Sequence, residues 1–334
     1  MEVKIGMGVD VDVQKIDVVI AWVDGNDQQH RLKRQQYQGI DIAQDAISET
    51  RFASDDEIYF SIASILKYVP YCGKIYLITD QQKPKFIDQF EQQGLCQPNQ
   101  IQIIDHQQLF KGYEQVLPTF NSLTIESMLW NIPQISRYCL YLNDDFFFNA
   151  ISTYDDFLKD NQIRIYGHWQ NSMMIQLKFR WRQWLNQNFG KNLQPKYTIA
   201  QMLSAKMVGL NRYFEIHHRP HLLDRDVLSQ FFLQHPDSLQ QQIQYRFRSP
   251  YQFLPVGLNN HLKIQQQQAI QEPDVKIAYL KNQQSTENFL EDLKNPDVKF
   301  GCVQSLDQLD KSTRVLIQQA LKHKFADFLP SSMA

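Results

Sequence analysis

The chain has 334 residues, 43% of them hydrophobic, and its 34 Lys and Arg nearly balance its 36 Asp and Glu, for a formal net charge of -2. This length suits one large domain or two ordinary ones. The balanced charge argues against a dedicated nucleic-acid binder, which normally carries a basic excess, and no apolar run is long enough to cross a membrane.

The cysteines and the first residues indicate the compartment. The cysteines have no paired spacing, so reduced thiols are expected and a zinc site is not; they are Cys72, Cys96, Cys139 and Cys302. The first fifteen residues lack a basic segment followed by an apolar one, so secretion is not expected. These features predict a cytoplasmic protein without a transmembrane segment.

Short apolar runs alternate with helical patterns through the first half of the chain. The runs are rich in β-branched residues and end at polar residues, as buried strands do. The expected strands are Asp17–Val23, Lys74–Thr79, Gln100–Asp105 and Tyr138–Leu142, and the helices between them are Glu57–Tyr68, Lys85–Gln93 and Thr124–Asn131. Such alternation predicts an α/β fold with a mostly parallel, Rossmann-like sheet flanked by helices.

The pattern changes near residue 160. The segment Gln176–Tyr213 is basic, aromatic and helical in pattern, and further helices are expected over Asp224–Leu233 and Asp307–Leu329. We therefore divide the chain into an α/β portion, residues 1–160, and a mostly helical portion, residues 161–334, which complete one catalytic unit together. Neither a G-x-G-x-x-G nor a G-x-x-x-x-G-K-[ST] loop is present, so the corresponding nucleotide-binding folds are not supported.

Polar residues follow three of the expected strands. Asp24, Asp80 and the group Asn143–Asp145 stand at strand ends, and ligands of open α/β sheets bind beyond the carboxyl ends of the strands. We expect the three positions to meet at one rim. Asp144 and Asp145 are hard oxygen ligands that suit Mg²⁺ or Mn²⁺. The alternative is a polar turn neutralised by a nearby arginine.

Two later motifs carry chemistry of their own. In the cluster His217, His218 and His221, a histidine can act as a general base, although a surface loop with chance histidines explains the cluster equally well. The cluster does not match a usual zinc pattern. Arg246 and Arg248 lie in a loop where arginine can contact phosphate, and ordinary surface charge is the alternative. The stretch Lys178–Trp184 is interpreted as an exposed helix face, or else as a surface for sugars or an anionic polymer.

Several of these stretches together resemble the Stealth family. The run IDVVIAWVDGND is similar to its first conserved region. The stretches RFASDDEIYFSIASILKYVPYCGKIYLITDQQKP and LPTFNSLTIESMLWNIPQISRYCLYLNDDFFF are similar to the second, and HHRPHLLDRDVLSQFF with the later FRSP resembles the third. This family includes bacterial capsular-polysaccharide phosphotransferases and the animal enzyme that adds N-acetylglucosamine-1-phosphate to lysosomal glycoproteins.

The resemblance implies a reaction, a metal and a set of residues. A sugar-1-phosphate would pass from a UDP-sugar to a sugar hydroxyl of an oligosaccharide or polysaccharide, with release of UMP and Mg²⁺ (or Mn²⁺) as cofactor. His218 would be the base, Arg248 the phosphate contact, and Asp144 and Asp145 the metal ligands. The residues expected to bind substrate are Trp22, Val23, Asp24, Asn121, Ser122, Glu126 and Asn143.

Two departures from the family pattern stand out. Tyr59 and Ala63 occupy positions where the family's second region commonly has arginines. Cys302 is followed by Val303-Gln304-Ser305 where the fourth region normally has an Asn-Asp pair. These differences leave room for a changed sugar preference or reduced activity.

Two other functions stay open. A metal-dependent glycosyltransferase would use the same donor but release UDP, and a non-catalytic subunit would bind the nucleotide sugar without turnover. In each case an association with capsule assembly machinery at the inner membrane is compatible with the sequence, and nucleic acid is not an expected partner.

Overall fold

A five-stranded sheet forms the centre of the protein. The computed structural model describes residues 15–39, 42, 44–47, 52, 54–190, 193–304 and 306–333. The strand order is β10-β4-β1-β2-β3, with bounds β1 Ile16–Ala21, β2 Cys72–Thr79, β3 Ile101–Asp105, β4 Tyr138–Asn143 and β10 His221–Asp224. The first four strands run parallel and β10 is antiparallel to β4. The four predicted strands and the mostly parallel α/β sheet are confirmed.

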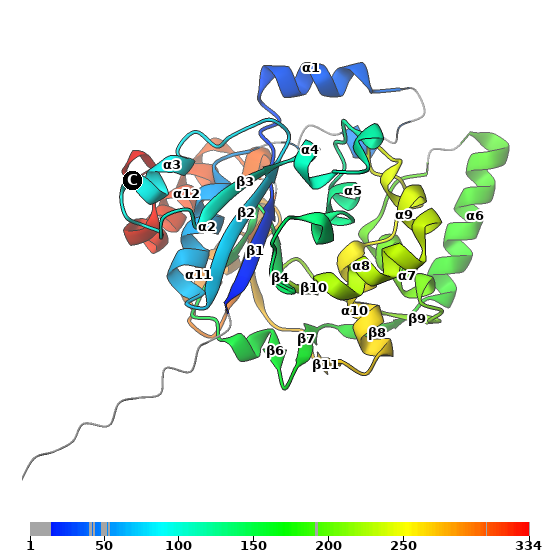
Figure 1. Cartoon of the computed structure of the whole chain (residues 1–334). Coiled ribbons are helices and arrows are strands. Elements are labelled where there is room, and N and C mark those ends of the chain that lie inside the picture. Colours follow the sequence, from blue (N-terminus) through cyan, green and yellow to red (C-terminus); the bar gives the residue numbers. More distant parts are fainter. Residues whose placement is uncertain are drawn as a thin grey trace, which may run out of the picture.

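Helices cover both faces of this sheet (Figure 1). On one side lie α2 Glu57–Tyr68, α11 Thr286–Lys294 and α12 Lys311–Phe325. The other side carries α5 Ser122–Glu126, α7 Tyr197–Met207, α8 Arg225–Gln234, α9 Pro236–Ile243 and α10 Pro255–Gln265. The remaining helices are α1 Gln28–Gln36, α3 Ile87–Gln92, α4 His106–Leu109 and α6 Met173–Phe189.

Smaller sheets connect the second half of the chain to the first. They contain β5 Phe146–Phe148, β6 Leu158–Lys159, β7 Gln162–Tyr166, β8 His168–Asn171, β9 Arg212–Glu215, β11 Ala269–Glu272, β12 Ile277–Leu280 and β13 Phe300–Val303. Strand β13 pairs with β5 of the first half, and β10 completes the central sheet. The second half is therefore less purely helical than predicted. One buried hydrophobic cluster includes residues from both halves. The core therefore marks no boundary between them, and the division at residue 160 stays a prediction.

The helix predicted over Thr124–Asn131 is shorter than expected. Helix α5 ends at Glu126, and a 3-10 turn over Leu129–Asn131 follows. The indole nitrogen of Trp130 donates to the carbonyl of Ser127 at 2.9 Å, and this carbonyl would otherwise accept the next helical hydrogen bond. Side-chain competition for backbone groups of this kind ends a helix.

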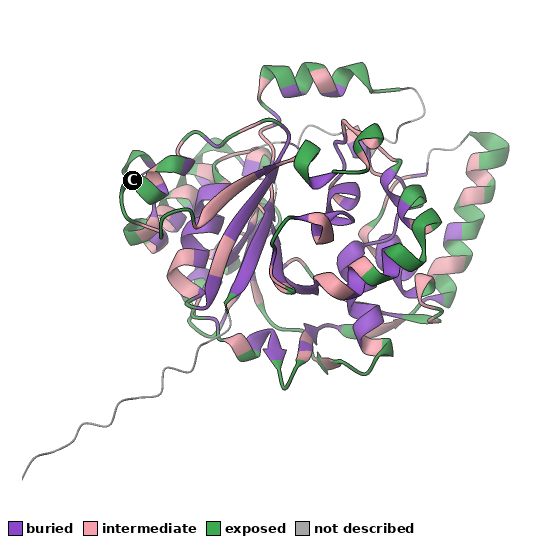
Figure 2. Ribbon diagram, in the orientation of Figure 1, coloured by how far each residue is buried: buried purple, intermediate pink, exposed green. Residues whose placement is uncertain are grey.

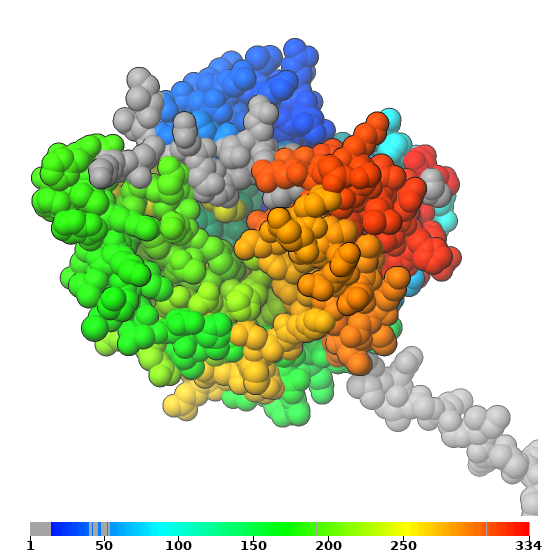
Figure 3. Space-filling model, turned by 180° about the vertical axis from the view of Figure 1, so that it is seen from behind, coloured from blue at the N-terminus to red at the C-terminus, as the bar shows by residue number. Residues whose placement is uncertain are grey.

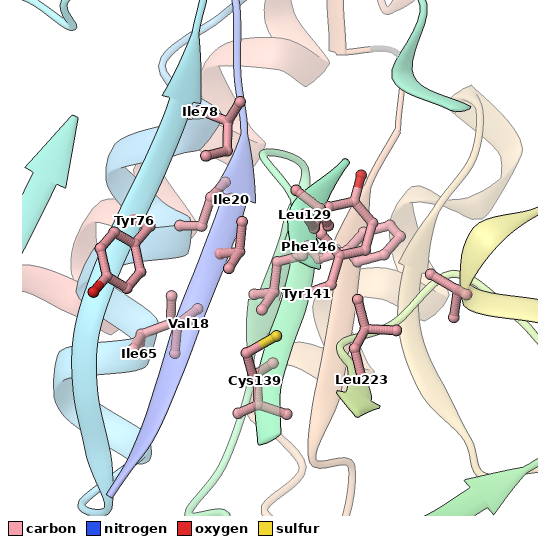
Figure 4. Packing of buried hydrophobic residues seen from close by; sticks show 14 of the residues in the cluster. Val18, Ile20, Ile65, Tyr76, Ile78, Leu129, Cys139, Tyr141, Phe146 and Leu223 are labelled. Atoms are coloured by element: carbon pink, nitrogen blue, oxygen red, sulfur yellow. The ribbon is translucent and has the colours of Figure 1, made fainter. Parts of the chain in front are cut away.

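The sheet is buried on both faces, as a covered parallel sheet must be. Figure 2 shows its strands mostly as buried ribbon. Val18 and Ile20 of β1 are fully buried, and they lie beside Cys139 and Tyr141 of β4, with Leu223 of β10 next to those (Figure 4). Each such side chain contributes about 1.5–3 kcal/mol when it leaves water.

A buried ion pair fixes β10 at the edge of the sheet. Asp224 and Lys263 are both fully buried, with the Lys263 Nζ 3.0 Å from an Asp224 carboxylate oxygen. Arg137 donates to the same carboxylate at 3.1 Å, and Asp224 also accepts from the backbone of α8 at Asp226. Burial alone would raise the pKa of Asp224, but the hydrogen bonds from Arg137 and Lys263 hold it below its usual range.

Removal of the Asp224 carboxylate should destabilise the fold strongly. We expect Asp224→Ala to lower the free energy of unfolding by about 3–5 kcal/mol, because Lys263 would remain buried without its partner. Asp226→Ala, two residues away on a partly exposed carboxylate, should cost about 1 kcal/mol or less. Urea denaturation of both variants measures the difference. Equal denaturation midpoints for the two variants would contradict a central role for the buried pair.

Candidate active site

A cavity of about 420 Å³ opens at the carboxyl ends of β1 and β4. Segments far apart in the sequence line it. They contribute Trp22, Val23, Glu57, Ser122, Asn143, Asp144, Asp145, His218, Arg248, Val303 and Gln304, together with other residues. The location agrees with the rule for open α/β sheets.

The register of the sheet brings His218 to the acidic pair. His221 of β10 is paired with Tyr141 of β4, and the two strands run in opposite directions. Three residues back from His221 and three residues on from Tyr141 lead to His218 and Asp144. Both side chains line the cavity, so two motifs 74 residues apart meet because β10 is antiparallel.

The cavity concentrates carboxylates. Burial, and for Asp144 the neighbouring Asp145 carboxylate, raises the pKa values of this pair. Glu57, the first residue of α2, also lines the cavity; burial and then the charge of Asp144 raise its pKa to about 8. Among the described residues, one Asp145 carboxylate oxygen is buried without a hydrogen-bond partner. Such a group stays charged only if a cation or further donors reach it.

His218 is held between aromatic rings. Its ring stacks on Tyr197 at 5.0 Å between centroids and on Tyr279 at 5.9 Å, while Phe146 meets it edge-on at 6.0 Å. Burial and then the Arg248 charge lower the pKa of His218 to about 4. The imidazole is therefore neutral at pH 7 and can accept a proton.

Arg248 supplies positive charge to the same cavity, close enough to act on both His218 and Asp145. Its guanidinium donates to Ser122 Oγ at 2.6 Å, and both residues line the cavity. Behind them Glu126 is buried; burial raises its pKa to about 7 although the Arg248 charge opposes the rise. The arginine is thus placed by α5 to face anionic groups in the cavity.

The structure separates some of the predicted substrate-binding residues from the cavity. Asn121 is fully buried and donates to the Tyr245 carbonyl at 3.0 Å and to Gln252 at 2.8 Å. It thereby holds the loop that carries Arg248. Asn143 does line the cavity, and its side-chain oxygen accepts from Tyr141 at 2.8 Å.

The three strand ends lie at the same edge of the parallel sheet, as predicted, but they do not share one cavity. Asp24 and Asp80 line a second cavity of about 600 Å³ instead. In it Lys33 pairs with Asp80 at 2.7 Å, and the Asp24 backbone nitrogen donates to Gln82 at 2.9 Å. Trp22 lines both cavities. The loop after each strand takes its own direction, and this direction was not readable from the strand ends.

The structure also shows where the two differences from the family pattern lie. Tyr59 is buried on α2 and accepts from the Phe86 backbone nitrogen at 3.0 Å, and Ala63 is fully buried on the same helix. Val303 and Gln304 line the main cavity, and the Cys302 thiol lies 3.5 Å from Asp145. Ser305, and residues 1–14 with the expectation about secretion, lie outside the described residues.

The other motif residues have structural contacts. Arg246 donates to the carbonyls of Val116 at 3.2 Å and Pro118 at 2.7 Å. His221 is buried, and its ring nitrogen lies 3.0 Å from the His217 carbonyl. Its side chain does not line the cavity, so His218 is the member of this cluster that does.

Sequence reasoning missed Glu57, Tyr197 and Tyr279 as parts of the site. Glu57 was interpreted only as the start of a helix, and the aromatic partners of His218 lie 21 and 61 residues from it in the chain. The pattern Ser54-Asp55-Asp56 before α2 indicates the acidic start of a helix. It does not indicate which residues from other segments lie beside Glu57.

One other group of side chains could hold a metal ion among the described residues. His168, His217 and Asp274 place ligand atoms within 4.8 Å of one another. All three side chains are substantially exposed, and the Asp274 carboxylate already lies 2.5 Å from a ring nitrogen of His168 and 3.1 Å from one of His217. The group does not line the main cavity.

Comparisons with known proteins identify two conserved regions in this chain. The family model described as Stealth protein CR1, conserved region 1, matches residues 14–41, and Stealth protein CR2, conserved region 2, matches residues 51–166. Both regions contribute to the cavity, through Trp22 and through Asn143–Asp145. The resemblance noted in the sequence is confirmed over these residues, while the roles of individual side chains stay predictions.

Relatives match over different lengths. Capsular polysaccharide phosphotransferase cps1A of Actinobacillus pleuropneumoniae is 39% identical over 44% of this chain and 39% of its own. LcbA of Neisseria meningitidis, another capsular polysaccharide phosphotransferase, is 43% identical over 40% of this chain and 35% of its own. Receptor polysaccharide phosphotransferase WefC of Streptococcus gordonii is 29% identical over 71% of this chain and 74% of its own. The match thus spans well under half of the first two relatives and about three quarters of the third.

The structure contains no candidate membrane span in the residues that it describes, because none of their helices is both long and apolar enough.

The raised pKa of Glu57 predicts a pH-dependent stability in a buffer without divalent cations. The pKa of the Glu57 carboxyl is about 4.5 in the unfolded chain and about 8 in the folded protein. Its contribution to stability is therefore fully present at a pH below the unfolded pKa, and it is lost as the pH rises through about 8. We expect Glu57→Gln to reduce the fall in unfolding free energy between pH 5 and pH 8.5 by about 4 kcal/mol.

Urea denaturation at the two pH values measures this change. Glu287, in the first turn of α11 and exposed, provides the matched control, and Glu287→Gln should leave the pH dependence as it is in the wild type. A Glu57→Gln variant with the wild-type pH dependence would show that Glu57 is ionised in the folded protein at neutral pH.

Proposed function

Because two conserved regions of the Stealth proteins match residues 14–41 and 51–166, we propose that this chain is a phosphotransferase of surface-polysaccharide synthesis. It transfers a sugar-1-phosphate from a UDP-sugar to a sugar hydroxyl of a growing capsular or related polysaccharide. The observation that carries this proposal is the meeting of His218, Arg248 and the Asn143–Asp145 turn in one cavity.

The proposed reaction forms and breaks one P–O bond. The acceptor hydroxyl attacks the phosphorus attached to the sugar, and the bond from this phosphorus to the oxygen bridging to the second phosphate breaks. The hydroxyl proton passes to the His218 imidazole, UMP leaves, and the product is a phosphodiester. In such transfers, positioning and electrostatic stabilisation supply most of the catalysis.

The neutral state of His218 supports its role as the base. The aromatic rings around it fix the plane of the imidazole, and a pKa lowered to about 4 keeps it unprotonated at pH 7. The same shift makes the resting imidazole a weak base. Proton transfer therefore depends on negative charge arriving beside it, which the bound diphosphate would bring.

Arg248 supports the binding of that diphosphate. Ser122 fixes one end of its guanidinium, and arginine contacts phosphate with several donors in one plane. Trp22 and Val23 line the cavity close to the end of β1, so we place the uridine there, with Ser122 and Asn143 near the phosphates. Asp24, Asn121 and Glu126 have supporting positions outside the lining.

The residues present fit a divalent cation. The unpartnered oxygen of Asp145 and the raised pKa values of Asp144 and Asp145 indicate carboxylates without enough positive charge around them. We propose that these two residues hold Mg²⁺, or Mn²⁺, because such ions prefer carboxylate oxygens. When bound, the ion would neutralise charge on the diphosphate.

The location of the reaction is part of the proposal. UDP-sugars are cytoplasmic metabolites, so we place the chain in the cytoplasm, working with polysaccharide assembly machinery at the inner membrane.

The departures at Tyr59 and Ala63 lie away from the main cavity, on buried positions of α2, and they therefore leave the proposed phosphate contact at Arg248 unchanged.

Nucleotide release tests the reaction. The protein is given a panel of UDP-sugars, Mg²⁺ and short capsular oligosaccharides, and we expect UMP as the released nucleotide. UDP would mean transfer of the sugar to the acceptor by attack on its anomeric carbon, and binding of the donor without release would favour a non-catalytic subunit. Either result would overturn the proposal.

Replacement of His218 tests the base. We expect His218→Ala to lower kcat by about 10²- to 10⁴-fold, as for loss of a general base. The neighbouring His217 is exposed and pairs with Asp274, so His217→Ala should change kcat by no more than a few-fold. Turnover of His218→Ala close to that of the wild type would exclude the assigned role.

Thermal unfolding tests the cation site without an activity assay. Saturating Mg²⁺ or Mn²⁺ should raise the Tm of the wild type by roughly 2 °C or more, and Asp145→Asn should abolish this increase. Asp307 also lines the cavity, and Asp307→Asn should retain the increase. An equal increase in Asp145→Asn would place the ion elsewhere, with His168, His217 and Asp274 as the next residues to vary.

A further inference from the structure

Helix α6 exposes a continuous stripe of large apolar side chains. Successive residues of the stripe are one, three or four positions apart, so their side chains lie on one face of the helix. Each is between 46% and 61% exposed, and they are Met173, Met174, Leu177, Trp181 and Trp184. The two tryptophan rings stack at 5.1 Å between centroids. Contiguous exposed apolar surface of this kind marks an interaction site more often than chance.

The opposite face of α6 anchors the helix to the protein. Phe179 is its buried residue, and it packs with Ile199, Met202 and Tyr213 in a small cluster separate from the main core. Figure 2 shows the rest of the helix as mostly exposed or intermediate ribbon, and in the view from behind this part of the chain forms the margin of the molecule (Figure 3). The stripe therefore faces outward from a fixed helix.

Positive charge surrounds the stripe. Lys178, Arg180 and Arg182 are exposed on α6, which contains no acidic residue. The whole segment 161–214 has no Asp or Glu but holds eight of the 34 basic residues, which leaves 26 basic against all 36 acidic residues elsewhere; the eight are Arg164, Lys178, Arg180, Arg182, Lys191, Lys196, Lys206 and Arg212. A chain of net charge -2 thus has a long segment whose charges are all basic, and this segment includes α6.

We propose that α6 lies flat on an anionic membrane surface. The stripe enters the boundary between headgroups and acyl chains, while Lys178 and Arg180 on its two flanks contact anionic headgroups. Amphipathic interfacial helices combine these two features, and tryptophan prefers this depth of a bilayer. Three of the five stripe residues are methionine or leucine. Their side chains are stabilised by leaving water for the acyl chains, whereas a carbohydrate partner would stack only on the flat aromatic rings.

This surface is linked to the cavity. Phe179 of α6 contacts Tyr251 at 6.2 Å between ring centroids, three residues after Arg248. Helix α6 also packs on α7, whose first residue, Tyr197, stacks on His218. Docking of α6 would therefore act on segments that carry Arg248 and contact His218, although the docking itself does not depend on the reaction proposed above.

Sedimentation with lipid vesicles tests the proposal on the full chain. We expect the protein to sediment with phosphatidylcholine vesicles that contain phosphatidylglycerol, and much less with phosphatidylcholine alone. The double change Trp181→Gln and Trp184→Gln should weaken partitioning at least about tenfold. Lys178→Gln and Arg180→Gln should each weaken it about fivefold on the anionic vesicles.

Leu233 provides the matched control, because it is 68% exposed on helix α8, away from the stripe. Leu233→Gln should leave partitioning unchanged, and wild-type thermal unfolding of all variants would show that they fold. Absence of sedimentation with anionic vesicles, or equal loss in Leu233→Gln, would overturn the proposal. A dimer in light scattering that only the double tryptophan variant separates would also overturn it. So would binding of an anionic polysaccharide to the two tryptophans in the absence of lipid.

Discussion

The antiparallel pairing of β10 with β4 is the constraint on which the site depends. Strands β1 to β4 could form a parallel sheet without it, but His218 would then have no fixed position. The pairing of His221 with Tyr141 sets the register, and the buried Asp224–Lys263 pair at the other end of β10 prevents it from slipping. A shift of one residue would turn the buried side chains of β10 toward the opposite face. Specificity of register, rather than net stability, is the best-attested benefit of a buried ion pair.

A second pairing completes the cavity from the C-terminal part of the chain. Cys302 of β13 lies opposite Phe146 of β5, so the residues after β13 reach the residues before β5. Gly301 permits this approach, because a Cβ atom there would collide with the Phe147 ring. Val303 and Gln304 therefore stand beside the Asp144–Asp145 pair, within the stretch Val303-Gln304-Ser305 where the family pattern has its Asn-Asp pair.

The electrostatics of the cavity are those of a site prepared for a charged ligand. Three carboxyl groups with raised pKa values, Glu57, Asp144 and Asp145, face an arginine and a neutral histidine. Like charges held this close cost folding free energy, and sites that bind cations and phosphates commonly carry such a cost. The positive segment around α6 is separate from this cavity in its chemistry, since it combines its charges with exposed apolar rings and not with buried polar groups.

The sequence by itself determined the parallel sheet, the Asn143–Asp145 turn at the end of a buried strand, and the Stealth resemblance, because each depends on residues close together in the chain. Only the tertiary structure decided that Asp24 and Asp80 belong to a different cavity, that Glu57 joins the acidic pair, and that Tyr197 and Tyr279 enclose His218. Local periodicity tells which face of an element is buried, but not how far or in which direction the following loop travels. Those directions come from strand register and from packing between segments separated by tens of residues, and these interactions leave no local pattern in the sequence.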